Sequence, residues 1–456
     1  MMTILCKITL QNRYSHQVVV LLLLILMILL QFTCGASLYA MDLLEAYGQA
    51  RRHDPLFGAS FYEHEAAKTS SQQGRSLLLP KISASGSASI IDYQTGPPQY
   101  QDYTGESVGI NLQQPLFNLA RFHEYRQYEI RGESGDVRFV SAEQDLMLRV
   151  CTTYFEVLAA GYLLDLIEVE KKAVSEQGEQ ARLMFQKGVS TITDVHDAEA
   201  RLDEVFAREI EAQNNLDIKM LAFKKIVGTK PSSLNILKED FPFGFPGPEN
   251  LEAWIEKAKK YQPVLKFYAY KIDYQLSELK KNKAQHLPTV DLVGGYKSTN
   301  SNNEIETSDH SYSFVGVQVN LPLFSGGYTT AKVAESEAVL EQSRKQYENA
   351  LAGITEEVSE AFLGIKGNMA RIEALLKAKK SASTSVISNR KSLNAGIRTT
   401  IDVLNAEKEL QNVKVNLLQA RYNCLLSMIK LKASAGLLSD EYLLTINSWL
   451  QAATTK

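Results

Sequence analysis

Two acidic residues follow glycines in near-copies of one phrase. The stretch "GVSTITDVHDAEARLDEV" begins at Gly188 and "GIRTTIDVLNAEKELQNV" begins at Gly396, so that Asp194 and Asp402 each stand six residues after the glycine. A carboxylate at such a place can accept hydrogen bonds from the first turn of a helix. It can also present negative charge to a cation. The repetition raises the question of which role the chain uses twice.

Enzymatic chemistry finds no support in the residue pattern. The seven histidines form no pair at metal-ligand spacing, and no P-loop, dinucleotide fingerprint, zinc-protease motif or nucleophile elbow occurs. The many Asp and Glu residues on helical stretches are typical of solvated faces. A net charge of −3 without a basic block argues against nucleic acid as a partner. We therefore predict a protein that is not an enzyme and needs neither cofactor nor metal.

The first forty residues have the pattern of an export signal. Basic residues precede thirteen unbroken apolar residues at 18–30, and small residues suited to a peptidase follow. A transmembrane anchor is the alternative, but the run is shorter than the roughly 18 to 20 residues that cross a bilayer. We predict a signal peptide over 1–40, cleaved after Ala36 or Ala40. Only Cys151 and Cys424 would then remain, and both are expected to be core thiols.

The rest of the chain repeats one unit. Asp54-Pro55 corresponds to Gln262-Pro263, and Leu79-Pro80 to Leu287-Pro288, at the same offset of 208 that relates the two glycines of the repeated phrase. We assign repeat 1 to 41–228, a proline-rich linker to 229–250, repeat 2 to 251–436 and a C-terminal tail to 437–456. Each unit has a helical lead-in, two alternating segments around a polar loop, and long helices.

Each unit contains one predicted β-hairpin, at about 81–116 and 289–323. Apolar side chains such as Ile82 and Ile90 alternate with a row of serines, which gives a strand one apolar and one polar face. Two hairpins supply four strands, too few to close a barrel alone, since barrels begin at about eight.

The helical stretches are unusually long. No proline occurs between Leu116 and Lys230 or after Pro322. A continuous helix over 324–391 would extend roughly 100 Å at about 1.5 Å per residue. The glycines of the repeated phrase can take the positive φ that ends such a helix, and Thr193 or Thr400 with the following Asp can cap the next one.

The segments "GVSTITDV", "GIRTTIDVLNAEKEL" and "NLLQARYNCLLSMIKLKASAGLLS" resemble the TolC family of outer-membrane efflux and type I secretion ducts. This resemblance implies a mixed α and β membrane protein that is a homotrimer. Three chains would form a twelve-stranded barrel in the lipid of the outer membrane, continuous with a helical barrel in the periplasm, and the linker would belong to an equatorial belt. A periplasmic adaptor and an inner-membrane ABC or proton-driven exporter would be its partners.

The resemblance also implies a gate at the periplasmic end. Six residues match its gate and constriction positions: Thr193, Asp194, Asp197, Arg398, Asp402 and Asn405. A second acidic ring of the family falls on Asn405, whereas the first repeat carries Asp197 where the best-known member has an asparagine. A latch tyrosine of the family falls on Leu393, which cannot hydrogen-bond through its side chain, so we expect a looser latch.

Two alternatives remain open from the sequence. Asp194 and Asp402 could serve only as helix caps, although capping and gating are compatible. The chain could also be an exported trimeric coiled-coil stalk or adhesin with a small barrel anchor.

Overall fold

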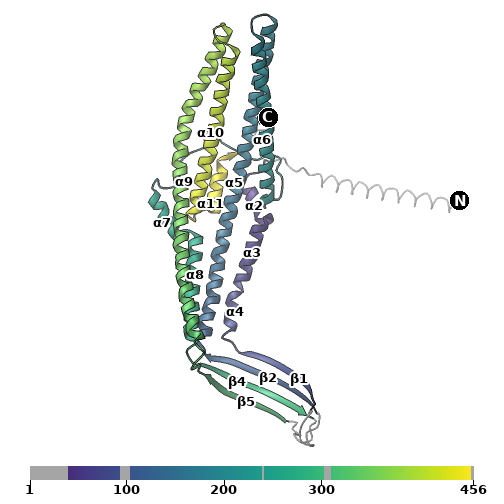
Figure 1. Cartoon of the computed structure of the whole chain (residues 1–456), viewed down its shortest axis with the longest axis vertical. Coiled ribbons are helices and arrows are strands. Elements are labelled where there is room, and N and C mark those ends of the chain that lie inside the picture. The colour runs from purple at the N-terminus through teal and green to yellow at the C-terminus, as the bar shows by residue number, and fades with distance from the viewer. Residues whose placement is uncertain (1–39, 93–102, 239–240, 302–309, 453–456) are drawn as a thin grey trace, which may run out of the picture.

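The computed structural model describes residues 40–92, 103–238, 241–301 and 310–452. The expected signal peptide and most of the two polar hairpin loops lie outside the described residues. The molecule is elongated, with two long helix pairs at one end and a curved sheet at the other (Figure 1).

Two helices of nearly equal length form the long axis. Helix α5 (Leu119–Gln186) has 68 residues and α9 (Tyr328–Asn394) has 67, so each extends about 100 Å. Each is followed by a helix that returns beside it, α6 (Ile192–Val227) after α5 and α10 (Thr400–Ser434) after α9 (Figure 1). The predicted long helices, and their reversal at the two glycine phrases, are confirmed.

Shorter helices flank this axis. They are α2 (Leu43–His53), α3 (Pro55–Lys68), α4 (Ser70–Ser76), α7 (Leu251–Tyr261), α8 (Pro263–Ala284) and α11 (Asp440–Ser448). Pro55 and Pro263 occupy the first turn of α3 and α8, where the missing N–H has no helical partner to lose. Helices α3 and α4 pack on α5, and α8 packs on both α5 and α9.

Four antiparallel strands form one sheet. The strands are β1 (Lys81–Ile91), β2 (Tyr103–Phe117), β4 (Thr289–Ser301) and β5 (His310–Asn320). Their order is β1-β2-β4-β5. Both predicted hairpins are therefore present, and the pairing of β2 with β4 joins them into one sheet. Within the described residues the sheet remains open, with β1 and β5 at its edges.

The sheet has an apolar and a polar face, as the alternation predicted. The apolar face carries Ile82, Ala84, Ile90, Val108, Ile110, Val315, Val317 and Val319. The polar face carries Ser83, Ser85, Ser87, Ser89, Asn111, Lys297 and Gln318. Every residue of β5 is exposed, and Val315 is 78% exposed. Among the residues that the structure describes, no helix covers the apolar face of β5.

The main core lies near the middle of the molecule. Helices α2 and α11, from opposite ends of the chain, meet there. Trp254 on α7, Tyr154 on α5 and Leu443 on α11 are completely buried there. The phenol of Tyr154 donates to the carbonyl oxygens of Met41 at 3.0 Å and Asn235 at 2.9 Å. Helix α5 alone, among the described residues, is long and apolar enough to cross a membrane by length and composition. Its buried side chains, however, make up much of this core.

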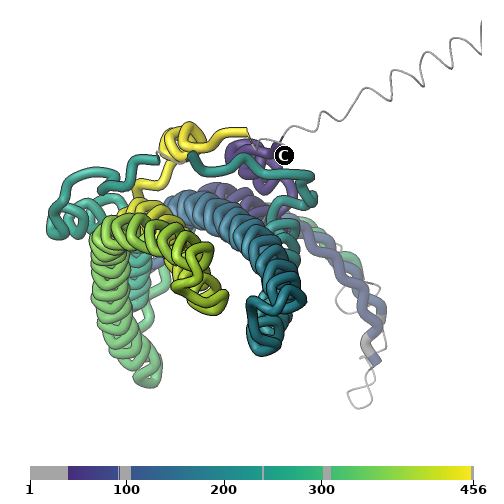
Figure 2. The backbone as a smooth tube through the Cα atoms, turned by 90° about the horizontal axis from the view of Figure 1, so that it is seen from above, coloured from purple at the N-terminus to yellow at the C-terminus, as the bar shows by residue number. Residues whose placement is uncertain are grey.

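The linker between the two halves of the chain joins this core. Its strand β3 (Ile236–Leu237) pairs with β6 (Leu450–Gln451) near the C-terminus. Figure 2 shows α2, α11 and the linker gathered on one side of the long helices. Cys151 and Cys424 are buried free thiols in the same core, as expected. Burial raises the pKa of Cys151 to about 12, so this thiol is inert at neutral pH.

Candidate functional site

The repeated phrase forms the two turns at the far tips of the helix pairs (Figure 1). Gly188 and Gly396 have φ angles of 74° and 73°, in the left-handed region. In each turn the glycine N–H bonds to the carbonyl of the residue three places earlier, at 2.9 Å. No atom lies within 4 Å of a Cβ built at either glycine. Backbone conformation, not crowding, is therefore what requires glycine here.

The threonines that cap the returning helices differ from those expected. Thr191 caps α6 and Thr399 caps α10, each through a reciprocal capping box with the Asp three residues later. The prediction of Thr193 and Thr400 as the caps is therefore wrong. Both residues lie inside the first helical turn. An N-cap residue stands before the helix, and only from there can its side chain accept from the backbone N–H two or three residues further on.

Asp194 and Asp402 are held in nearly identical surroundings. The Oδ2 atom of each accepts from the backbone N–H of its capping threonine at 2.9 Å and from the threonine hydroxyl at 2.9 Å. Asp194 also accepts from the hydroxyl of Ser190 at 2.5 Å. The Ser190 bond, followed by the Thr191 amide, lowers the pKa of Asp194. The Thr399 amide, followed by its hydroxyl, lowers the pKa of Asp402. Both residues are therefore ionised at neutral pH, and both do cap helices.

Arg398 is what distinguishes the second turn from the first. It occupies the position that Ser190 has in the first turn, four residues before the aspartate. Its Nη1 lies 3.4 Å from Oδ1 of Asp402, and 56% of its side chain is exposed. Within one chain, Arg398 thus pairs with its own turn rather than with Asp194. Most of its five N–H donors remain available to other groups.

The remaining predicted positions lie beside these turns. Asp197 and Asn405 are one helical turn beyond the capping aspartates, on the same helix face, and both are exposed. Thr193 is also exposed, whereas Leu393 is partly buried. The structure thus brings the six predicted site residues to two tips at one end of the molecule, but it leaves each tip as a separate cluster.

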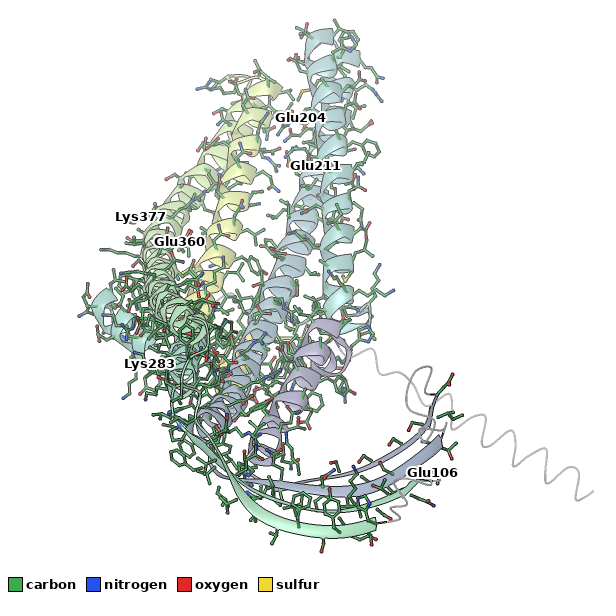
Figure 3. The ribbon with its side chains drawn as sticks, turned by 60° about the horizontal axis from the view of Figure 1, so that its bottom comes forward. Glu106, Glu204, Glu211, Lys283, Glu360 and Lys377 are labelled. Carbon is green, nitrogen blue, oxygen red and sulfur yellow. The ribbon has the colours of Figure 1, made fainter. Side chains whose placement is uncertain are left out.

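Sequence reasoning missed a second set of contacts, deeper along the helix pairs. Glu170 on α5 is 5% exposed and accepts from Arg201 at 2.9 Å and from Arg208 at 2.6 Å, both on α6. Arg201 also pairs with Glu204, which in turn lies 3.3 Å from Lys408 on α10. We call these five residues the charged clasp. Figure 3 shows Glu204 on the side of α6 that faces the α9–α10 pair.

Two further contacts accompany the charged clasp. The Nε2 atom of Gln411 on α10 donates to the carbonyl oxygen of Leu166 on α5 at 2.6 Å. Leu404, 3% exposed, packs into a small core formed by α5 and α6. Leu404 and Gln411 are seven residues apart, which places them on one face of α10. This spacing was visible in the sequence, but it could not identify the helix that the face contacts.

Comparison with known proteins identifies the family to which the chain belongs. Residues 46–229 and 254–437 match the model of the family described as outer membrane efflux protein. The chain is 31% identical to outer membrane protein TolC of Vibrio cholerae, covering 92% of this chain and 96% of that protein. It is 30% identical to alkaline protease secretion protein AprF of Pseudomonas aeruginosa, covering 88% and 86%.

Solved structures agree on the fold. The outer membrane protein VceC of Vibrio cholerae superposes with a TM-score of 0.76 at 17% identity, covering 86% of this chain and 96% of that one. The CusC channel gives a TM-score of 0.77 at 15% identity, covering 87% and 92%. The chain therefore belongs to the outer membrane efflux protein family, and it is an outer-membrane duct for efflux or type I secretion with its helices in the periplasm.

Proposed function

We propose that three copies of the chain form the conducting duct. The open sheet carries this proposal, because β1 and β5 each leave one edge without a paired strand among the described residues. Unpaired backbone groups cannot be tolerated in the hydrocarbon core of a membrane. Three sheets of four strands would close a twelve-stranded barrel, with the apolar face towards lipid and the polar face towards the lumen.

The helices of the trimer would continue this barrel into the periplasm. The order of elements supports a duplicated unit, since helices, two strands and two long antiparallel helices occur once over 41–228 and again over 251–436. The linker at 229–250 and the tail at 437–456 would form the equatorial belt. An exported stalk or adhesin is set aside, because the family that the chain matches consists of efflux proteins.

The two turns would form a gate at the periplasmic end. In a trimer, three copies each of Asp194, Asp197 and Asp402 converge, and like charges there repel one another. Arg398 holds Asp402 within its own turn and has donors left for Asp194 of a neighbouring chain. Such an exposed pair contributes about 1 kcal/mol or less at each of three boundaries. Because Leu393 cannot join a hydrogen-bonded latch, the gate would depend on these charges and on the charged clasp.

Transport through this duct would require two partners. We propose a periplasmic adaptor that binds the helical barrel, and an inner-membrane ABC or proton-driven exporter that supplies energy. Two relatives are named for protease secretion, PrtF of Dickeya chrysanthemi and AprF of Pseudomonas aeruginosa. These names support a secretion role beside efflux for the present chain.

Single-channel recording from purified protein in a lipid bilayer tests the duct. A detergent-stable trimer with discrete conductance steps is expected, and a monodisperse monomer that still forms pores would refute the trimer. The gate is tested by Arg398→Ala, expected to raise conductance, and by Asp402→Asn, expected to lower cation selectivity and block by multivalent cations. Asn keeps an oxygen acceptor for the cap, so lost charge is separated from lost capping. Glu373→Gln, on an exposed face of α9, is the matched control. Unchanged conductance, selectivity and block in both variants would show that Arg398 and Asp402 do not form a gate, and Asp402 would then serve only in the helix cap.

A further inference from the structure

One row of side chains on the polar face of the sheet combines aromatic rings with a lysine. His310, Tyr312 and Phe314 follow one another along that face of β5. The ring centroids of His310 and Tyr312 are 6.1 Å apart, and those of Tyr312 and Phe314 are 6.3 Å apart. Tyr312 lies directly opposite Lys297 of β4. We call Lys297, Tyr312 and Phe314 the basic-aromatic patch.

Glycines beside the basic-aromatic patch leave its side chains standing clear of their neighbours. The Cγ of Lys297 lies 4.0 Å from the place where a Cβ would stand on Gly109 of β2. The Cε1 of Phe314 lies 2.9 Å from the corresponding place on Gly295 of β4, so a larger residue there would displace the ring. Tyr312 and Phe314 remain 47% and 45% exposed, and Lys297 is exposed as well. All three side chains are therefore open to a molecule beside the polar face.

Among the described strand residues, Lys297 has no acidic neighbour on the polar face. The other Lys, Arg, Asp and Glu residues of that face are Lys81 and Asp291, both near the helical end of the sheet. Asp291 precedes Lys297 on β4 by roughly 20 Å, at about 3.3 Å per residue. Glu106 of β2 lies on the opposite face, in the same row as Val108. The ammonium group of Lys297 therefore presents an uncompensated positive charge that attracts anions.

We propose that the basic-aromatic patch binds aromatic anions on their way through the duct. This inference rests on the proposed function, which turns the polar face towards the lumen, and it names a class of cargo for that lumen. The ammonium group of Lys297 would pair with a carboxylate or sulfonate, and the rings of Tyr312 and Phe314 would stack on the aromatic part. A low-dielectric wall around the lumen focuses the attraction. Because each contact is exposed to water and weak, the anion is released again, as conduction requires.

Block of single-channel current measures this binding in the full chain. The probe is naphthalenesulfonate on both sides of the bilayer, and propanesulfonate is the matched anion without a ring. Lys297→Gln removes the charge, and Tyr312→Ser removes one ring. We expect the concentration of naphthalenesulfonate that halves the current to rise about fivefold in each variant, as for the loss of one exposed charge pair or one aromatic contact. Propanesulfonate should block the unmodified chain less strongly, and Tyr312→Ser should leave that block unchanged.

Three variants serve as controls. Lys297→Arg keeps the charge, Tyr312→Phe keeps the ring, and Lys81→Gln removes a lysine from the same face away from the patch, so naphthalenesulfonate should block all three as it blocks the unmodified chain. Equal weakening in Lys81→Gln and Lys297→Gln would indicate a generally positive lumen and overturn the patch. Unchanged block in Lys297→Gln and Tyr312→Ser, or equal block by the two sulfonates, would also overturn it, while conductance steps from the trimer would leave the duct intact. A chain without conductance steps would refute the duct itself, and the patch with it.

Discussion

Removal of the buried carboxylate of the charged clasp tests whether its ion pairs hold α5 and α6 together below their tip. Glu170→Ala leaves Arg201 and Arg208 without the anion that accepts from both of them. Breaking a buried ion pair costs about 3–5 kcal/mol, because the remaining charge stays desolvated. Arg201 keeps Glu204, and the Arg208 side chain is 33% exposed. We therefore expect about 3 kcal/mol, the low end of that range.

Native-state hydrogen exchange provides the assay, because it measures local opening in an intact trimer. A loss of about 3 kcal/mol corresponds to exchange about 100-fold faster in the middle of α5 and α6, with the main core unchanged. Glu179→Ala is the matched control on the same helix, since Glu179 is 69% exposed and makes only a 3.5 Å pair with Arg182. Its expected effect is below about 1 kcal/mol. Equal exchange rates in the two variants would show that the charged clasp does not stabilise this region.

Three further predictions concern the turns and the topology. Gly396→Ala should destabilise the second tip by about 1–2 kcal/mol because Gly396 has a positive φ. The control is Gly353→Ala, in the interior of α9 with open space around it, which should not destabilise the tip. Hydrogen exchange at the tip measures the effect of both variants. The lowered pKa of Asp194 means that its stabilising contribution is present above its ordinary pKa of 3.8 and is lost as the pH falls through the lower folded value. The protection of the tip amides, taken relative to their intrinsic exchange rate at each pH, should therefore fall in acid, and this fall should be smaller in Asp194→Asn. A protease site inserted near Pro97 or Asn302, both outside the described residues, should be cut from outside intact cells, whereas one at Asp194 should be protected; the opposite pattern would invert the topology.

The local elements of this protein follow from its sequence. Proline-free stretches with helical periodicity gave α5 and α9, and strict alternation gave the strands, because both signals depend on neighbours within a few residues. The turn glycines were likewise evident, since a positive φ is a property of a single residue. Even here the choice of cap was wrong: Thr191 and Thr193 differ by only two positions, and helix boundaries are the least certain part of such reasoning.

Tertiary structure decided which distant elements meet. No residue pattern indicated that β2 pairs with β4, and that pairing turns two hairpins into one sheet with two free edges. Nor could it show that Gln411 reaches Leu166, 245 residues away, or that Glu170 is buried between two arginines. Apolar periodicity identifies which face of a helix is buried. Which other helix buries that face is decided only when all the helices pack together. For the same physical reason, Arg398 could be recognised as a cation near the gate, but its pairing with Asp402 could be seen only in the folded turn.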